Sequence, residues 1–193
     1  MPKTYSYQIL FPYLKEAVAT NRSKFVLQVK DTDYELVPVN CSEKHVDPEI
    51  IALLTQARNA NPSSFLTMFT ATEERTRKWL TQVVGKEDNR ILFMLKNKSK
   101  KSYYGYMGLA FGNSERSYIE ADAVVRTDKN IIRGLMKASL TRLLQWVGSD
   151  LKINNIGVRV LSDNDALAFY NKCGFIKQKT EDLYEVKDAS GKV

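Results

Sequence analysis

The stretch "LSDNDALAFYNKCGF", residues 161–175, decides the fold. It follows "NNIGVRVL", in which apolar side chains alternate with others at the two-residue period of a β-strand. Ser162 is a typical helix N-cap, and the acidic Asp165 stands three residues later, as in a capping box. The predicted helix has one mainly apolar face, formed by Ala166, Phe169, Tyr170 and Cys173. Gly174 is positioned to end this helix in the left-handed conformation, and Phe175 to begin another strand.

Composition and charge limit the classes of protein to consider. The 193 residues suit one domain that buries its core without disulfides or metals. Cys41 and Cys173 have neither disulfide-framework nor metal-ligand spacing, which favours a reducing, cytoplasmic setting and no metal site. The N-terminus lacks a signal-peptide layout, and the longest apolar run, "ILFML", is too short to cross a bilayer, so no membrane association is expected. The net charge of +7 favours an anionic partner.

Alternating helix and strand signals predict one α/β domain without repeats or linkers. The strand "RILFML" is apolar on both faces and is therefore expected near the centre of the sheet. A capping box at Thr70 and Glu73 predicts one helix start. The other expected elements are a helix at 11–20, strands at 24–30 and 34–40, a helix at 47–59 capped by Asp47, and a strand at 103–112.

The segment "RSYIEADAVVR", residues 116–126, predicts a strand with two carboxylates on one face. Strict alternation places Ile119, Ala121, Ala123 and Val125 on one face, and Tyr118, Glu120, Asp122 and Val124 on the other. A long helix follows, with Ile132, Leu135, Met136, Leu140, Leu143 and Val147 expected on its buried face. Exposed N–H groups and the helix dipole make the start of that helix a candidate anion site.

The last hundred residues resemble the GNAT superfamily of N-acetyltransferases. "GVRVLSDNDALAFYNKCGF" is similar to the family segment "v-x-x-x-N-x-x-a-i-x-f-Y-x-k-x-G-F", with matches at Asn164, Ala166, Phe169, Tyr170, Gly174 and Phe175. The family's Q/R-x-x-G-x-G/A loop corresponds to Ile131, Ile132, Arg133, Gly134, Leu135 and Met136. Only Gly134 fits that loop outright, because Ile131 replaces Gln or Arg and Met136 replaces a small residue.

The upstream half resembles the "R-N … T-x-E-x-x-x-W-L" region of GNAT enzymes that acetylate nucleotide-linked amino sugars or protein N-terminal amines. On this resemblance, Arg58 and Asn59 are candidate acceptor residues, and Phe65, Tyr104 and Tyr106 are expected to border the acceptor. The implied organisation is one domain spanning residues 1–193. It comprises an N-terminal extension at 1–32, acceptor-side helices at 33–85 and an acetyl-CoA-binding core at 90–186.

The resemblance also implies a fold and a mechanism. The fold would be a mixed, mostly antiparallel sheet flanked by helices and splayed at the acetyl-CoA site. Pantetheine would lie along Val124, Val125 and Arg126, and the diphosphate on the loop at 131–136. Glu120 is the first choice, and Asp122 the second, for the base that deprotonates the amine. Tyr170 would protonate the departing thiolate, and Asn164 would hydrogen-bond the pantetheine or the strand end.

Structural alternatives exist for these residues. Tyr170 could be a core aromatic, Asn164 a turn residue, and both carboxylates ordinary solvated groups. His45, the only histidine, has no serine or cysteine motif nearby, so a nucleophilic triad has little support.

Three functions remain open. The first is acetyl-CoA-dependent N-acetylation of a small anionic amine such as a nucleotide-linked amino sugar. The second is acetylation of a protein N-terminal or lysine amine. The third, a non-catalytic module binding nucleic acid, has less support because the lysine cluster at 96–101 is short and lacks interleaved aromatics. A homodimer is compatible with all three.

Overall fold

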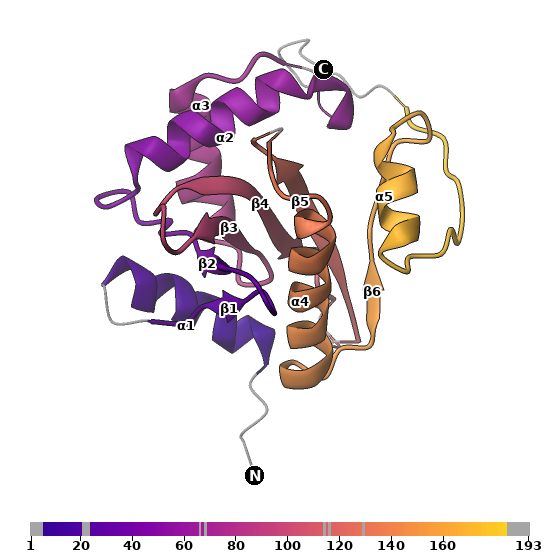
Figure 1. Ribbon diagram of the computed structural model, residues 1–193, viewed down its shortest axis with the longest axis horizontal. Helices are drawn as coiled ribbons and strands as arrows, with labels where there is room; N and C mark the ends of the chain where they lie inside the picture. The colour runs from indigo at the N-terminus through magenta and orange to yellow at the C-terminus, as the bar shows by residue number, and fades with distance from the viewer. Residues whose placement is uncertain are drawn as a thin grey trace.

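The structure is a computed structural model that describes residues 6–20, 24–65, 67, 69–113, 115, 117–128 and 130–184. Six strands form one sheet in the order β1-β2-β3-β4-β5-β6 (Figure 1). Neighbouring strands are antiparallel, except that β5 and β6 are parallel. The predicted mixed, mostly antiparallel α/β sheet is therefore confirmed. The strands are β1 (Leu27–Gln28), β2 (Tyr34–Pro38), β3 (Ile91–Asn97), β4 (Tyr103–Ala110), β5 (Tyr118–Arg126) and β6 (Asn155–Gly157).

Helices cover both faces of this sheet. On one face, α1 (Tyr7–Ala19) and α4 (Leu135–Asp150) bury a core that includes Phe11, Phe93 and Trp146. On the other face, α2 (Pro48–Ala60) and the π-helical turn η2 (Trp79–Val84) bury a second, smaller core. The short helix α5 (Ala166–Lys172) lies beside β6 at the sheet edge opposite β1 (Figure 1). The remaining helical elements are η1 (Pro62–Ser64) and α3 (Glu73–Lys78).

The helix boundaries test the capping signals. Asp47 caps α2 as predicted, because its carboxylate accepts a hydrogen bond of 2.9 Å from the Glu49 N–H. The predicted start of the first helix was wrong: α1 begins at Tyr7, and the Ser6 hydroxyl caps it. Thr72, rather than the predicted Thr70, caps α3 through the Arg75 N–H. Thr72 stands only two residues after Thr70, so the capping box placed this helix start to within a few residues.

Two irregularities change which side chains of β4 and β5 share a face. Tyr106 of β4 lies opposite Val125 of β5, and Gly108 of β4 lies opposite Asp122 of β5. Two steps along β4 therefore match three along β5, so β5 contains one extra residue at a β-bulge. Ala123 sits in this bulge with a φ of 51°. Ile119 and Ala121 consequently pack on the α1–α4 side, whereas Ala123 and Val125 pack on the α2 side. The predicted common face for these four residues was wrong beyond Asp122.

The bulge in β4 has a parallel effect. Leu95 pairs with Gly105 and Lys96 with Tyr103, which leaves Tyr104 as the extra residue. The Tyr104 ring therefore packs edge-on against Tyr34, 5.3 Å away between centroids, on the α1–α4 side.

The end of the chain differs from its prediction as well. Gly174 ends α5 in the left-handed conformation, with a φ of 94°, as predicted. No strand begins at Phe175, because residues 175–184 have no ladder partner within the described chain. Ile132, expected on the buried face of the long helix, precedes α4 and is 61% exposed.

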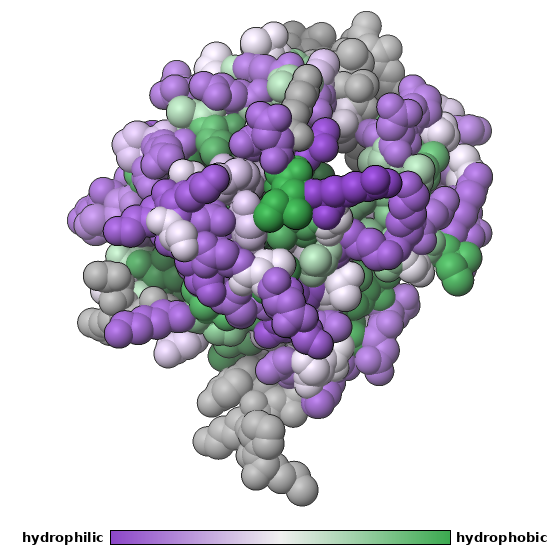
Figure 2. Space-filling view, viewed as in Figure 1, coloured by the Kyte–Doolittle hydropathy of each residue, from purple (hydrophilic) through white to green (hydrophobic). Residues whose placement is uncertain are grey.

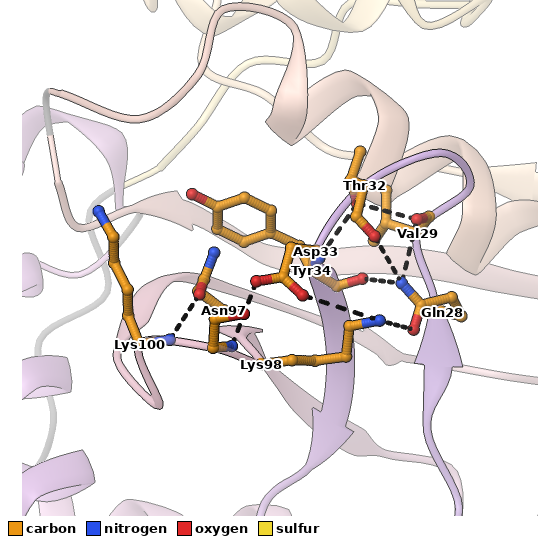
Figure 3. Close-up of polar contacts among 9 residues, drawn as sticks. Gln28, Val29, Thr32, Asp33, Tyr34, Asn97, Lys98 and Lys100 are labelled. Carbon is orange, nitrogen blue, oxygen red and sulfur yellow. Dashed lines mark hydrogen bonds and ion pairs between the residues drawn. The ribbon is translucent and has the colours of Figure 1, made fainter.

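The basic turn between β3 and β4 is hydrogen-bonded to the segment around the β1–β2 loop (Figure 3). The Lys98 ammonium donates to the Gln28 side-chain carbonyl at 3.1 Å and lies 3.9 Å from an Asp33 carboxylate oxygen. The Asp33 carboxylate also accepts from the Ser99 N–H. These contacts hold the turn against the loop that joins β1 to β2.

The surface visible in Figure 2 is mainly hydrophilic, with apolar side chains in small separate areas. Among the described residues, no helix is long and apolar enough to span a bilayer.

Candidate functional site

A cleft opens where β5 and β6 separate. Their parallel pairing extends only to Glu120 opposite Gly157, whereas β5 continues to Arg126. Beyond Glu120, the β6-facing edge of β5 therefore has no ladder partner among the described residues. The cleft that begins at this split has a volume of about 2120 Å³ and lies between α2, β5, the start of α4 and α5. This exceeds the usual 300–1,000 Å³ of a single-ligand pocket, so two substrates fit side by side.

The start of α4 forms one wall of this cleft. Gly134 precedes the helix with a φ of 85°, and a side chain built there would meet no atom within 4 Å. The Leu135 N–H donates to the Ile132 carbonyl. The first regular helical hydrogen bond runs from the Ala138 N–H to the Gly134 carbonyl. The N–H groups of Met136 and Lys137 thus have no partner in the described chain, as expected in a first helical turn.

Those free N–H groups fit an anionic phosphate, which helix N-termini attract. Arg133 and Lys137 line the cleft at the same place and are exposed. Met136 replaces the small residue of the family loop, and its side chain packs against Gly105 of β4. A Cβ added at Gly105 would lie only 3.1 Å from the Met136 sulfur. The glycine in β4 therefore makes room for this larger side chain, and the loop at 131–136 can hold a diphosphate despite its sequence.

The two carboxylates of β5 have different environments. Glu120 is buried and fully engaged: one oxygen lies 2.7 Å from the Arg159 Nε, and the other accepts from the Tyr118 hydroxyl at 3.1 Å. Asp122 has no such side-chain partner in the described chain, and burial raises its pKa above the ordinary aspartate value. Asp122 is thus the carboxylate that is better prepared to take up a proton from a neighbour.

Tyr170, for which the sequence predicted the role of proton donor, lines the cleft from α5. Its ring packs edge-on against Phe169 and Phe175, and its hydroxyl makes no hydrogen bond in the described chain. Burial and the nearby Asp122 raise the pKa of the phenol to about 12, so it remains protonated at neutral pH. The phenol is thus both buried against the core and available as a proton donor.

Asn164 has a structural contact of its own. Its side-chain carbonyl accepts a 2.8 Å hydrogen bond from the N–H of Ala166, the first residue of α5. The N-cap position is Asp165, whose side chain makes no capping hydrogen bond, so the predicted cap at Ser162 was wrong. Asn164 lines the cleft, and its side-chain NH₂ has no partner in the described chain.

The candidate acceptor residues divide into two groups. Phe65 and Tyr106 line the cleft, and burial raises the pKa of the Tyr106 phenol. Tyr104 does not, because the β4 bulge turns it to the other face, and Tyr103 lines the cleft instead. Asn59 uses its whole side-chain amide on Ala71, accepting from its N–H at 2.8 Å and donating to its carbonyl at 3.0 Å.

Several cleft residues were missed by the sequence reading. Arg75 and Phe69 join Arg58 and Phe65 at the α2–α3 end, where the Arg75 guanidinium lies 3.4 Å from the Phe69 ring centroid. Arg159 and Phe111 join Glu120 at the opposite end, with the guanidinium 4.2 Å from the ring centroid. All these contacts join residues distant in sequence or in loops, so strand and helix periodicity gave no signal for them.

Metal ligands are not grouped in this site. The residues that the structure describes contain no cluster of three or more histidine, cysteine or acidic side chains suited to hold an ion. Cys41 is buried beside α1, and burial raises the pKa of its thiol to about 12, which makes it a poor nucleophile.

Several solved structures share the overall fold of this chain. Spermidine N-acetyltransferase from Vibrio cholerae, in complex with CoA and spermine, covers 76% of this chain and 83% of its own, with a TM-score of 0.63 and 14% identity. RimL, a ribosomal L7/L12 alpha-N-protein acetyltransferase in complex with coenzyme A, covers 77% and 81%, with a TM-score of 0.62 and 15% identity. Apo FdhC, a nucleotide-linked sugar GNAT, covers 77% and 82%, with a TM-score of 0.61 and 14% identity.

Searches with protein-family models and among curated protein sequences gave no match. The structural likeness nevertheless defines the class of architecture: the chain has the GNAT fold, with the six-stranded sheet and flanking helices expected from its sequence. At 14–15% identity the likeness establishes the fold, and the activity must be argued from the cleft itself.

Proposed function

We propose that the protein is an N-acetyltransferase that moves an acetyl group from acetyl-CoA to the amine of a small acceptor. One observation carries the proposal. The β5–β6 split leaves unpaired strand edge next to the free N–H groups of α4, so an extended amide chain and its diphosphate fit one continuous surface. Acetyl-CoA would supply the thioester, and Val124 to Arg126 and the 131–136 loop would hold it.

Asp122 is the residue to which we assign the role of general base. An amine is mostly protonated at neutral pH and must lose a proton before it attacks. Asp122 lines the cleft and has a raised pKa, which brings the carboxylate closer to the working pH than an ordinary aspartate. Glu120, the first choice from the sequence, is instead occupied by Arg159 and Tyr118.

Tyr170 is assigned as the proton donor to the departing thiolate. Its hydroxyl is protonated at neutral pH, faces the cleft and is near enough to Asp122 for the carboxylate to raise its pKa. The Asn164 NH₂ is assigned to hydrogen-bond the pantetheine as the sequence pattern suggested. Tyr170 lies on α5 and Asn164 lies two residues before its start, so one short segment of the chain positions both side chains.

A nucleotide-linked amino sugar remains the preferred acceptor. The net charge of +7 and the arginines at the α2–α3 end suit an anionic molecule. FdhC, with the same fold, is a nucleotide-linked sugar GNAT. A second candidate, a protein N-terminal amine, is favoured by the 2120 Å³ of open cleft and by the fold shared with RimL.

Calorimetric titration with acetyl-CoA tests the donor site. The Arg133→Glu, Lys137→Glu variant reverses charge at the start of α4, and Lys24→Glu, Lys30→Glu makes the same net change at exposed positions outside the cleft. Losing charge-assisted hydrogen bonds of about 1.5–3 kcal/mol each should weaken binding at least tenfold in the first variant. Equal affinity in both variants, or no binding by the native protein, would contradict the proposal.

The acceptor is tested by CoA release with matched amines. A UDP-linked amino sugar, the free amino sugar and an N-terminal peptide are compared at saturating acetyl-CoA. Preference for the peptide would move the protein N-terminal amine to first place.

A further inference from the structure

Two arginines at the α2–α3 end of the cleft share one aromatic ring. The guanidinium carbon of Arg58 lies 4.0 Å from the centroid of Phe69, and that of Arg75 lies 3.4 Å from it. Arg58 also lies 4.2 Å from the centroid of Phe65. We call these four side chains the arginine–phenylalanine stack. All four line the cleft.

This stack carries two positive charges without a counter-ion. Neither Arg58 nor Arg75 forms an ion pair in the described chain, and the adjacent Glu74 pairs with Lys78 at 2.7 Å instead. Burial lowers the pKa of the Arg58 guanidinium, and the neighbouring charge of Arg75 lowers it further. Two like charges held on one ring are destabilised until an anion binds between or beside them.

The stack also has unused hydrogen-bond donors. Arg58 donates from one terminal nitrogen to the carbonyl and hydroxyl of Thr67, at 2.7 Å and 3.0 Å. Its Nε is buried and has no hydrogen-bond partner among the residues that the structure describes. The Arg75 side chain makes no hydrogen bond in the described chain. A buried donor without a partner is uncommon in folded proteins, and a ligand oxygen would satisfy it.

The described residues on either side of Phe69 are hydrogen-bonded to α2. Asn59 makes two hydrogen bonds to the backbone of Ala71, and Arg58 donates to Thr67, so Thr67 and Ala71 are both anchored to that helix. Phe69 lies between these anchors. A guanidinium held on an aromatic face keeps its in-plane N–H fork free for bidentate contact with phosphate.

We propose that Arg75 and Arg58, held on Phe69, bind the phosphate or diphosphate of the acceptor. This inference deepens the proposed function and rests on it for the identity of the reaction. It assigns the acceptor to phosphorylated amines, with the amine directed toward Asp122 and the anion held at the α2–α3 end. Arg58 has two roles in this arrangement, as anchor of the loop and as a ligand for the anion.

Pyrophosphate is the probe that tests this site without turnover. The native protein is first saturated with CoA, which occupies the anion site at the start of α4, and pyrophosphate is then titrated by calorimetry. Arg75→Gln should weaken pyrophosphate binding at least tenfold. Arg77→Gln, two residues along the same helix, exposed and outside the cleft, should change it less than twofold. CoA affinity should be equal in all three proteins.

Three results would overturn the inference. The first is that the CoA-saturated native protein binds no pyrophosphate. The second is that Arg75→Gln and Arg77→Gln weaken pyrophosphate binding equally. The third is that Arg75→Gln loses pyrophosphate binding only because its CoA affinity has changed. With a UDP-linked amino sugar, Arg75→Gln should raise KM at least tenfold with little change in kcat, and should leave KM for the free amino sugar unchanged. An equal rise in both KM values would also contradict the assignment.

Failure of the proposed function is distinguishable from failure of this site. If the native protein binds no CoA, the acetyltransferase proposal falls. Pyrophosphate titration without CoA then tests the stack directly, because Arg75→Gln and Lys137→Gln remove different anion sites.

Discussion

Substitution of Gly157 by alanine should damage the point at which β5 and β6 separate. A Cβ at this position would lie 2.1 Å from the Tyr118 hydroxyl oxygen and 2.8 Å from the ring carbon that bears it. Real side chains do not approach so closely, so the Tyr118 ring must rotate away. The rotation breaks its hydrogen bond to Glu120, which is also the ion-pair partner of Arg159. One methyl group thus disrupts the polar contacts that close the base of the cleft.

The expected cost follows from three contributions. Loss of the hydrogen bond costs about 0.5–1.5 kcal/mol. Forcing a tyrosine side chain off its preferred rotamer costs about 0.5–1.5 kcal/mol. Replacing glycine outside the left-handed region restricts the unfolded chain and returns about 0.4–1 kcal/mol. The free energy of unfolding should therefore fall by about 1–2 kcal/mol.

Urea unfolding followed by circular dichroism measures this change, and Tyr118→Val supplies the matched background. Without the tyrosine ring, Gly157→Ala should be neutral or stabilising by up to about 1 kcal/mol. The double-mutant cycle then gives a coupling energy between positions 118 and 157. The same loss of stability in both backgrounds, or no loss in the native background, would refute the reasoning.

Three further predictions concern single side chains. Asp122→Asn should abolish most acetyl transfer, and in the native protein the rate should fall as pH falls through the raised pKa of Asp122, above the ordinary value of about 3.9. Since this pKa is raised by folding, the carboxyl stabilises the fold at low pH and loses that contribution as pH rises. The free energy of unfolding of Asp122→Asn minus that of the native protein, measured by urea unfolding, should therefore increase from about pH 4 upward. A difference that does not change with pH would contradict the raised pKa of Asp122. Tyr170→Phe should lower kcat roughly 100-fold and leave the CoA affinity, measured by calorimetry, unchanged. Tyr13→Phe, on the exposed face of α1, is the control and should alter neither quantity. Equal kcat values in the two variants would remove Tyr170 from the mechanism. Lys15→Met should lower the free energy of unfolding by about 1–3 kcal/mol, measured by thermal unfolding. The buried ammonium donates to the backbone carbonyls of Val84 and Glu87, at 2.9 Å and 2.6 Å, and both carbonyls would lose this donor. Native-like thermal stability would show that water replaces the ammonium.

The sequence predicted those parts of the fold that depend on local periodicity. The helix capped by Asp47, the fully buried strand β3 and the left-handed Gly174 all follow from patterns within a few residues. The β-bulges at Tyr104 and Ala123 do not, because each inserts one residue into an unbroken alternation. A bulge leaves the pattern of letters intact and reverses the face of every side chain beyond it.

The candidate site shows the same division. Tyr170 and the loop at 131–136 lie in segments with recognisable spacing, and both border the cleft. The engagement of Glu120 by Arg159 joins residues 39 positions apart, and the stack of Arg75 on Phe69 depends on an irregular loop. Charge and type alone could not show which carboxylate is occupied or which arginine lacks a partner. Those properties belong to the three-dimensional arrangement.

The packing of α1 has a consequence for folding during synthesis. Lys15 on this helix bonds to the carbonyls of Val84 and Glu87, the Tyr7 hydroxyl donates to the Asn113 carbonyl, and Phe11 stacks on Trp146. Every one of these partners is made later on the ribosome. At about 5–20 residues per second, the last of them, Trp146, appears roughly 6 to 25 seconds after the end of the helix. Helix α1 is made before these partners and is thus among the last elements to dock, and its apolar face stays exposed in the interval.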